Sequence, residues 1–140
     1  MSRLLLTVGL AATAVLVAFL IRRFRPTSVT RLPDPRGYSV PEQIDRADFS
    51  HSERPWLVAV FTSATCDGCQ GTWEKAKHVE SDTVAVDEIE VTARRDLHDK
   101  YGIEAVPAVL ICDADGNVQS WFLGPPKAGE LWGRVAELTG

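Results

Sequence analysis

Two cysteines, Cys66 and Cys69, are separated by two residues and closely follow an apolar run, Trp56–Phe61. A Cys-x-x-Cys where a strand gives way to a helix is typical of a dithiol that cycles with its disulfide. The spacing predicts Cys66 at the helix N-terminus, where unpaired N–H groups and the helix dipole favour a thiolate. Because a thiolate is the nucleophile of disulfide exchange, we expect Cys66 to attack and Cys69, one turn deeper, to release the product.

A metal site is the other common use of such a pair. Structural zinc needs four ligands, usually with a second close pair of them. The other cysteine and the three histidines show no such pairing: Cys112, His51, His78 and His98. The sequence therefore predicts neither a metal nor an organic cofactor. Cys112 alternates with Ala108 and Leu110 in an apolar run, so we expect it to be a buried, small hydrophobic residue.

The elements that position the pair can be read from apolar periodicity. Trp56–Phe61 is a nearly continuous apolar run, typical of a strand covered on both faces, and residues 66–79 have helical spacing. The predicted elements that follow are a strand at Val84–Val91, a helix at Thr92–Tyr101, strands at Ala108–Cys112 and Val118–Leu123 joined by a turn, and a helix at Lys127–Leu138. This order, βαβαββα, predicts an α/β fold with a mixed central sheet flanked by helices.

The N-terminal part of the chain has a different composition. Residues 1–3 form a short tail, and Leu4–Ile21 is an uncharged stretch of 18 residues, long enough as a helix to cross a bilayer. Arginines follow it at once, and a small-residue cleavage site does not, so a transmembrane anchor is favoured over a cleaved signal peptide. Residues 22–39 are rich in Arg and Pro and predict a linker, which leaves 40–140 as one domain.

Charge divides the chain in the same place. Residues 1–36 carry six Arg and one Asp, whereas residues 37–140 carry nine basic and eighteen acidic side chains. Arginines after the span favour a single-pass protein of the cell membrane with its domain on the cytoplasmic side, although the extracytoplasmic side stays open. The acidic domain argues against nucleic-acid binding, because it repels phosphates.

Three stretches together resemble the thioredoxin family. They are VAVFTSATCDGC at Val58–Cys69, YGIEAVPAVLI at Tyr101–Ile111, and DGNV at Asp115–Val118 followed by Gly124. The resemblance implies a thioredoxin-like fold with a cis Val106–Pro107 bond beside the cysteines. It further implies that Val106, Pro107 and Gly124 line a groove for an extended substrate.

A second resemblance is weaker. Peroxiredoxins have Thr or Ser three residues before their reactive cysteine, as Ser63 is placed here. They also have a proline four residues before that position, where this chain has Ala59.

Several positions depart from the thioredoxin pattern. Thr65 replaces the usual Trp before the first cysteine, and Asp67-Gly68 replaces the usual Gly-Pro between the cysteines. The family's buried acid, its proton relay, falls at Val60, and the lysine that pairs with it falls at Glu88. We regard Glu88 as a candidate substitute relay and Asp67 as a candidate modulator of the Cys66 thiolate. The first strand and helix are compressed into about residues 40–53.

These observations predict a membrane-tethered thiol–disulfide oxidoreductase with Cys66 and Cys69 as its catalytic residues. Its expected partners are protein dithiols or disulfides, a redox partner protein, and the lipid bilayer at residues 4–21; we expect a monomer. The direction of electron flow stays open, because reductants and oxidants share this fold. The alternative is a catalytically weak thioredoxin-fold module for binding or assembly at the membrane.

Overall fold

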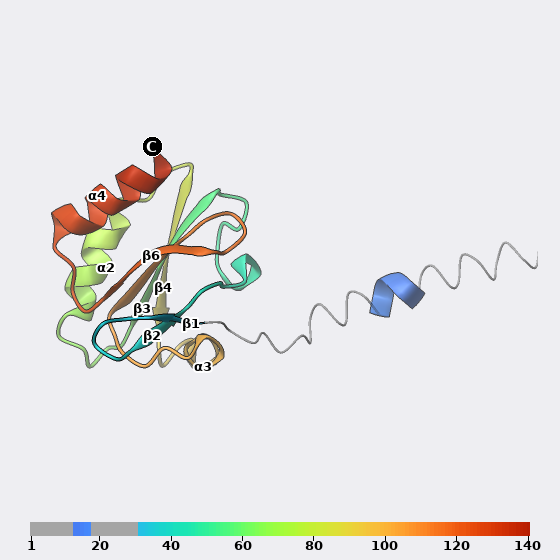
Figure 1. Ribbon diagram of the computed structural model, residues 1–140, viewed down its shortest axis with the longest axis horizontal. Helices are drawn as coiled ribbons and strands as arrows, with labels where there is room; N and C mark the ends of the chain where they lie inside the picture. The colour runs from blue at the N-terminus through green and yellow to red at the C-terminus, as the bar shows by residue number, and fades with distance from the viewer. Residues whose placement is uncertain (1–12, 18–30) are drawn as a thin grey trace, which may run out of the picture.

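The computed structural model describes residues 13–17 and 31–140 (Figure 1). Residues 13–17 are helical and exposed. Within the described part of the chain, no helix is both long and apolar enough to cross a membrane. Most of the predicted span at 4–21, and residues 22–30 of the predicted linker, lie outside the described residues.

A four-stranded sheet forms the centre of the domain. Its strands are β3 (Trp56–Thr62), β4 (Val84–Glu90), β5 (Ala108–Cys112) and β6 (Val118–Leu123), in the order β4-β3-β5-β6. β3 is parallel to β4 and antiparallel to β5, and β5 is antiparallel to β6. The mixed sheet predicted from the sequence is confirmed. Residues 57–61 of β3 are fully buried, because helices or loops cover both faces.

Helices α2 (Cys69–Lys77) and α4 (Ala128–Thr139) lie side by side on one face of the sheet (Figure 1). Between these helices and the sheet lies one apolar cluster, formed by Val58, Val60, Val84, Val86, Val109 and Ile111 from the strands and by Ala76, Leu131 and Val135 from the helices. Alternate residues of each strand point to opposite faces, so positions 58, 60 and 62 all face α2.

Helix α3 (Arg95–Tyr101) contributes to the cluster on the other face, as do Ile44 and Phe49, which flank the short 3-10 helix η1 (Arg46–Asp48). Leu97 and Tyr101 of α3 are buried. The hydroxyl of Tyr101 donates a hydrogen bond to Asp48 and accepts one of 3.0 Å from the backbone of Asp45. These bonds attach the segment before β3 to α3. The compressed first strand and helix expected at residues 40–53 correspond to one short strand and η1.

A β-hairpin lies where the sequence predicted the end of a linker. Strand β1 (Arg31–Pro33) pairs antiparallel with β2 (Ser39–Pro41). The prediction of a linker is therefore wrong for residues 31–39, which form part of this hairpin and pack on the domain. Arg31 attaches the hairpin to the end of α3, where its Nη1 donates to the carbonyl of Gly102 at 3.0 Å.

Candidate active site

Cys66 and Cys69 are joined by a disulfide, with their Cα atoms 5.4 Å apart. Cys66 is half-buried, whereas Cys69 is only 2% exposed. The sequence predicted a helix from residue 66, but α2 begins at Cys69. The turn from Ser63 to Cys66 delays it, since the Cys66 N–H donates to the Ser63 carbonyl at 3.1 Å. Cys66 thus lies one turn before the helix and is the more exposed residue of the two.

Gly68, between the two cysteines, packs against Pro125 in the loop that joins β6 to α4. A Cβ atom built on Gly68 would lie 2.4 Å from Cγ of Pro125, which is far inside van der Waals contact. The amide of Thr72 donates to the Gly68 carbonyl at 3.1 Å, and its hydroxyl does so at 2.8 Å. A side chain at this position would therefore require Pro125 to move.

The second motif lies at the start of β5. The Val106–Pro107 peptide bond is cis, as the resemblance implied. Gly124 follows β6 with a φ of +88°, a conformation that favours glycine. Its N–H donates to the carbonyl of Pro107 at 2.8 Å. The structure thus brings Pro107 and Gly124 together, and Pro125 joins this pair to the loop of the cysteines.

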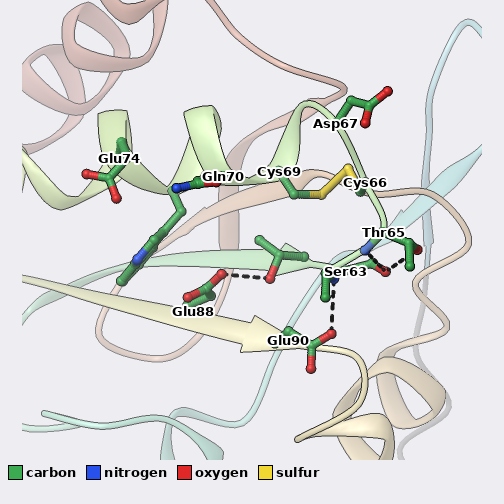
Figure 2. A pocket seen from close by; sticks show the side chains of 12 residues that line it. Ser63, Thr65, Cys66, Asp67, Cys69, Gln70, Glu74, Glu88 and Glu90 are labelled. Atoms are coloured by element: carbon green, nitrogen blue, oxygen red, sulfur yellow. Dashed lines mark hydrogen bonds between the residues drawn. A yellow bond between two sulfur atoms is a disulfide. The ribbon is translucent and has the colours of Figure 1, made fainter.

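A pocket of about 600 Å³ opens beside the disulfide, on the side of β4 (Figure 2). Both cysteines line it. The other lining residues come from the end of β3, the turn after it, α2 and β4: Thr62, Ser63, Ala64, Thr65, Asp67, Gln70, Trp73, Glu74, Glu88 and Glu90. Four of them are carboxylates and none is basic. The pocket gives the nearly buried Cys69 a polar neighbourhood.

Glu88 lies where the sequence placed it, beside Val60. The two residues are direct partners in the parallel register of β3 and β4, so they face the same side of the sheet. Val60 is fully buried among apolar side chains and has no proton to exchange. Glu88 is exposed at the pocket, and its carboxylate accepts a hydrogen bond of 2.9 Å from the hydroxyl of Thr62 (Figure 2).

The other carboxylates of the pocket have partners of their own. Glu90 accepts hydrogen bonds from the backbone N–H groups of Ala64, Thr92 and Ala93. Burial alone would raise the pKa of Glu90, but these hydrogen bonds lower it overall. Glu74 pairs with Lys77 at 2.8 Å. Glu90 was not among the residues predicted from the sequence, although Glu88-Ile-Glu90 alternates along a strand and so puts both carboxylates on one face.

Asp67 and Cys112 differ in their relation to the site. Asp67 is exposed, and Figure 2 shows its carboxylate turned away from the disulfide. Cys112 is fully buried in β5, as predicted, and burial raises the pKa of its thiol. Among the residues of the described ranges, no three His, Cys, Asp or Glu side chains form a group that could hold a metal.

Comparison with known proteins gives close relatives. No family model matches the chain. A probable thioredoxin of Methanothermobacter thermautotrophicus is 36% identical over 78 residues, which cover 54% of this chain and 86% of that protein. A probable thioredoxin of Methanothermobacter marburgensis is 34% identical over 83 residues, covering 57% of this chain and 92% of the relative.

Solved structures show the same fold. A mutant thioredoxin from Halobacterium salinarum superposes with a TM-score of 0.57 at 22% identity, covering 64% of this chain and 79% of the other. A thioredoxin of Trichomonas vaginalis gives a TM-score of 0.53 at 15% identity, with coverage of 60% and 79%. The archaeal relatives are matched over most of their own length at more than 30% identity. This chain therefore belongs to the thioredoxin family and is a thiol–disulfide oxidoreductase.

Proposed function

We propose that this chain is tethered to a membrane and exchanges its Cys66–Cys69 dithiol or disulfide with protein substrates. The observation that carries the exchange is the disulfide itself. It joins a half-buried cysteine to one that is nearly buried, and both line an acidic pocket. This asymmetry gives the two cysteines different roles.

The reaction in the reducing direction has two steps. The Cys66 thiolate attacks one sulfur of a substrate disulfide, a mixed disulfide forms, and the other substrate sulfur leaves as a thiolate. Cys69 then loses its proton and attacks the Cys66 sulfur, so that the first substrate sulfur leaves as a thiolate. The substrate gains two electrons and the cysteine pair loses two. The oxidising direction is the reverse, and a dithiol or disulfide of a redox partner protein restores the starting state.

Cys66 is the attacking group in this scheme because a substrate can reach it. It also precedes α2, where unpaired backbone N–H groups stabilise a negative charge. Asp67 lies next to it but turns outward (Figure 2). We therefore assign Asp67 at most a small effect on the Cys66 thiolate.

Glu88 is the proposed proton acceptor for Cys69. A nearly buried thiol needs a base within reach when it attacks, and the pocket that Cys69 lines offers four carboxylates. Of these, Glu90 is held by three backbone N–H groups, Glu74 by Lys77, and Asp67 points away. Glu88 has one hydrogen bond, from Thr62, and its second oxygen is free among the described residues to receive a proton directly or through pocket water.

Val106, Pro107 and Gly124 are the proposed binding residues for the substrate backbone. The hydrogen bond between Gly124 and the Pro107 carbonyl aligns the two segments on the side of the disulfide opposite the pocket. Val106 is half-buried there. An extended peptide whose cysteine reaches Cys66 would cross these residues.

Residues 4–21 are the proposed membrane anchor, followed by arginines at the lipid surface. The support is their uncharged sequence, since attachment by arginines alone would be weaker and screened by salt. The arginines favour a cytoplasmic domain. We expect one copy of the chain to suffice for exchange.

The function is tested by reduction of insulin with the full chain, purified in detergent and supplied with dithiothreitol. Wild type and Cys112→Ser should accelerate the reduction, whereas Cys66→Ser should not. A wild type that gives no acceleration would leave the alternative, a thioredoxin-fold module for binding or assembly.

A further inference from the structure

The β1–β2 hairpin lies on the Gly124 side of the disulfide. Figure 1 shows it at the end of the domain where the loops leading into α2 and α4 also lie. Its turn is closed by two backbone hydrogen bonds, from Asp34 to the Tyr38 carbonyl at 2.9 Å and from Gly37 to the Asp34 carbonyl at 3.0 Å. Arg31 fixes its base to Gly102. The hairpin is therefore an ordered part of the surface around the cysteines.

Arg36, in the turn of the hairpin, is held in one orientation by Asp34. Its Nε donates to the Asp34 carboxylate at 3.0 Å and its Nη2 at 3.3 Å. The Asp34 side chain is 8% exposed, whereas that of Arg36 is 55% exposed. Nη1 of Arg36 has no hydrogen-bond partner among the described residues. Asp34 thus orients the guanidinium and leaves one of its nitrogens available to a ligand.

Contacts connect this nitrogen to the disulfide. A Cβ built on Gly124 would lie 3.6 Å from Nη1 of Arg36, so the guanidinium lies against that glycine. The N–H of Gly124 donates a hydrogen bond to the carbonyl of Pro107. The next residue, Pro125, packs on Gly68, which lies between the two cysteines in the sequence. Arg36 therefore lies close enough to Cys66 to contact residues of a bound peptide that neighbour the peptide's reacting cysteine.

The two sides of the disulfide differ in charge. The pocket is lined by four carboxylates and by no basic side chain, and only one of the four, Glu74, is paired with a lysine, Lys77. On the other side Arg36 is joined by Lys75, whose Nζ donates to the carbonyl of Pro126 at 2.9 Å. The carboxylate nearest to Arg36 in sequence, Asp34, is already paired with Arg36, and the one nearest to Lys75, Glu74, is paired with Lys77.

We propose that Arg36 is a specificity residue that receives a carboxylate of the protein substrate, close to the substrate's reacting cysteine. This inference rests on the exchange function proposed above. A guanidinium suits this task because its N–H groups match carboxylate oxygens in geometry and charge. Acidic residues beside the substrate cysteine would be drawn to the Gly124 side and repelled from the pocket side.

The test uses the full chain, reduced and in detergent, with a set of disulfide-linked peptides. The peptides carry Asp or Asn at each of the two positions before and after the cysteine, and kcat/KM is measured for each. Wild type should prefer Asp at one or more positions by about two- to fivefold, the range of an exposed ion pair. Arg36→Gln should lose that preference and keep its rate with the Asn peptides.

Arg134→Gln is the matched control, because Arg134 is also an exposed arginine paired with a carboxylate, Glu137, at 2.8 Å. It should keep the preference for Asp, and the wild-type preference should shrink as salt is raised. An Arg36→Gln protein that retains the preference, or a wild type with none at any position, would overturn the assignment. A wild type that reduces none of the peptides would instead refute the exchange function itself.

Discussion

The hydroxyl of Thr62 donates a hydrogen bond of 2.9 Å to the carboxylate of Glu88, in the pocket that Cys69 also lines. Both residues face α2: Thr62 is two residues after buried Val60 along β3, and Glu88 is the partner of Val60 on β4. The arrangement puts a carboxylate at the edge of the apolar cluster rather than inside it. Glu88 therefore remains in contact with solvent, in the pocket where we propose that it accepts the proton of Cys69.

The first prediction follows from this position. Glu88→Gln removes the proposed proton acceptor but keeps the size of the side chain, so the attack of Cys69 on the mixed disulfide should slow by on the order of tenfold or more near neutral pH. Rapid quenching and mass spectrometry of a mixed disulfide at Cys66 would give this rate. Glu74→Gln is the control, since Glu74 lines the same pocket but pairs with Lys77. Equal rates in the two variants would exclude the role of Glu88.

A second prediction concerns the reactivity of the three thiols. In the reduced, folded protein a small alkylating agent should modify Cys66 first, then Cys69, and Cys112 last. Exposure decreases in that order, and burial raises the pKa of the Cys112 thiol, so little of it is thiolate. Peptide mapping after timed quenching gives the three rates. Fastest modification of Cys69 or Cys112 would show that the nucleophile is wrongly assigned.

The contact between Gly68 and Pro125 leads to a prediction about stability. Gly68→Ala would place a methyl group 2.4 Å from the proline ring, and overpacking of this kind destabilises by about 1–3 kcal/mol. Gly71→Ala, two residues into α2, has no atom within 4 Å of its new Cβ and should stabilise the helix by about 0.5–1 kcal/mol. Urea unfolding of the oxidised proteins measures both free energies. A Gly68→Ala protein as stable as Gly71→Ala would mean that the loop of Pro125 gives way.

The proposed anchor predicts how the protein fractionates. The full chain should stay with membranes after a high-salt wash, and its N-terminal sequence should still include residues 4–21. Insertion of an apolar span resists salt, whereas attachment by arginines is screened. A variant with Arg22, Arg23 and Arg25 changed to Gln should remain bound as well. Release of the wild type by salt, or a mature N-terminus beyond Arg25, would end the anchor proposal.

The strands were the most predictable part of the fold. β5 and β6 have the predicted bounds, and β3 extends one residue further than its apolar run, to Thr62. Continuous apolar residues bounded by turn residues define such strands locally. Helix starts were less predictable: α3 begins at Arg95 rather than Thr92, because the Glu90 side chain accepts the N–H groups of Thr92 and Ala93 in a turn.

The hairpin at residues 31–41 could not be predicted for a different reason. Three-residue strands carry no measurable periodicity, and prolines and arginines are typical of linkers. Its order depends on distant contacts, such as that between Arg31 and Gly102, 71 residues apart. For the site, the cysteines and Pro107 were evident from their motifs. Arg36 and Pro125 were not, because only the folded chain brings them beside Gly124 and Gly68.

The most direct test of the account is to trap the mixed disulfide. Full-length Cys69→Ser, reduced and mixed with a disulfide-bonded protein such as insulin, should accumulate a covalent complex joined through Cys66, because the resolving thiol is gone. Cys66→Ser should accumulate none, and Cys112→Ser should turn over as the wild type does. Mass spectrometry of the non-reduced complex identifies the linked cysteine. No complex with Cys69→Ser, or equal complexes with both variants, would contradict exchange through Cys66.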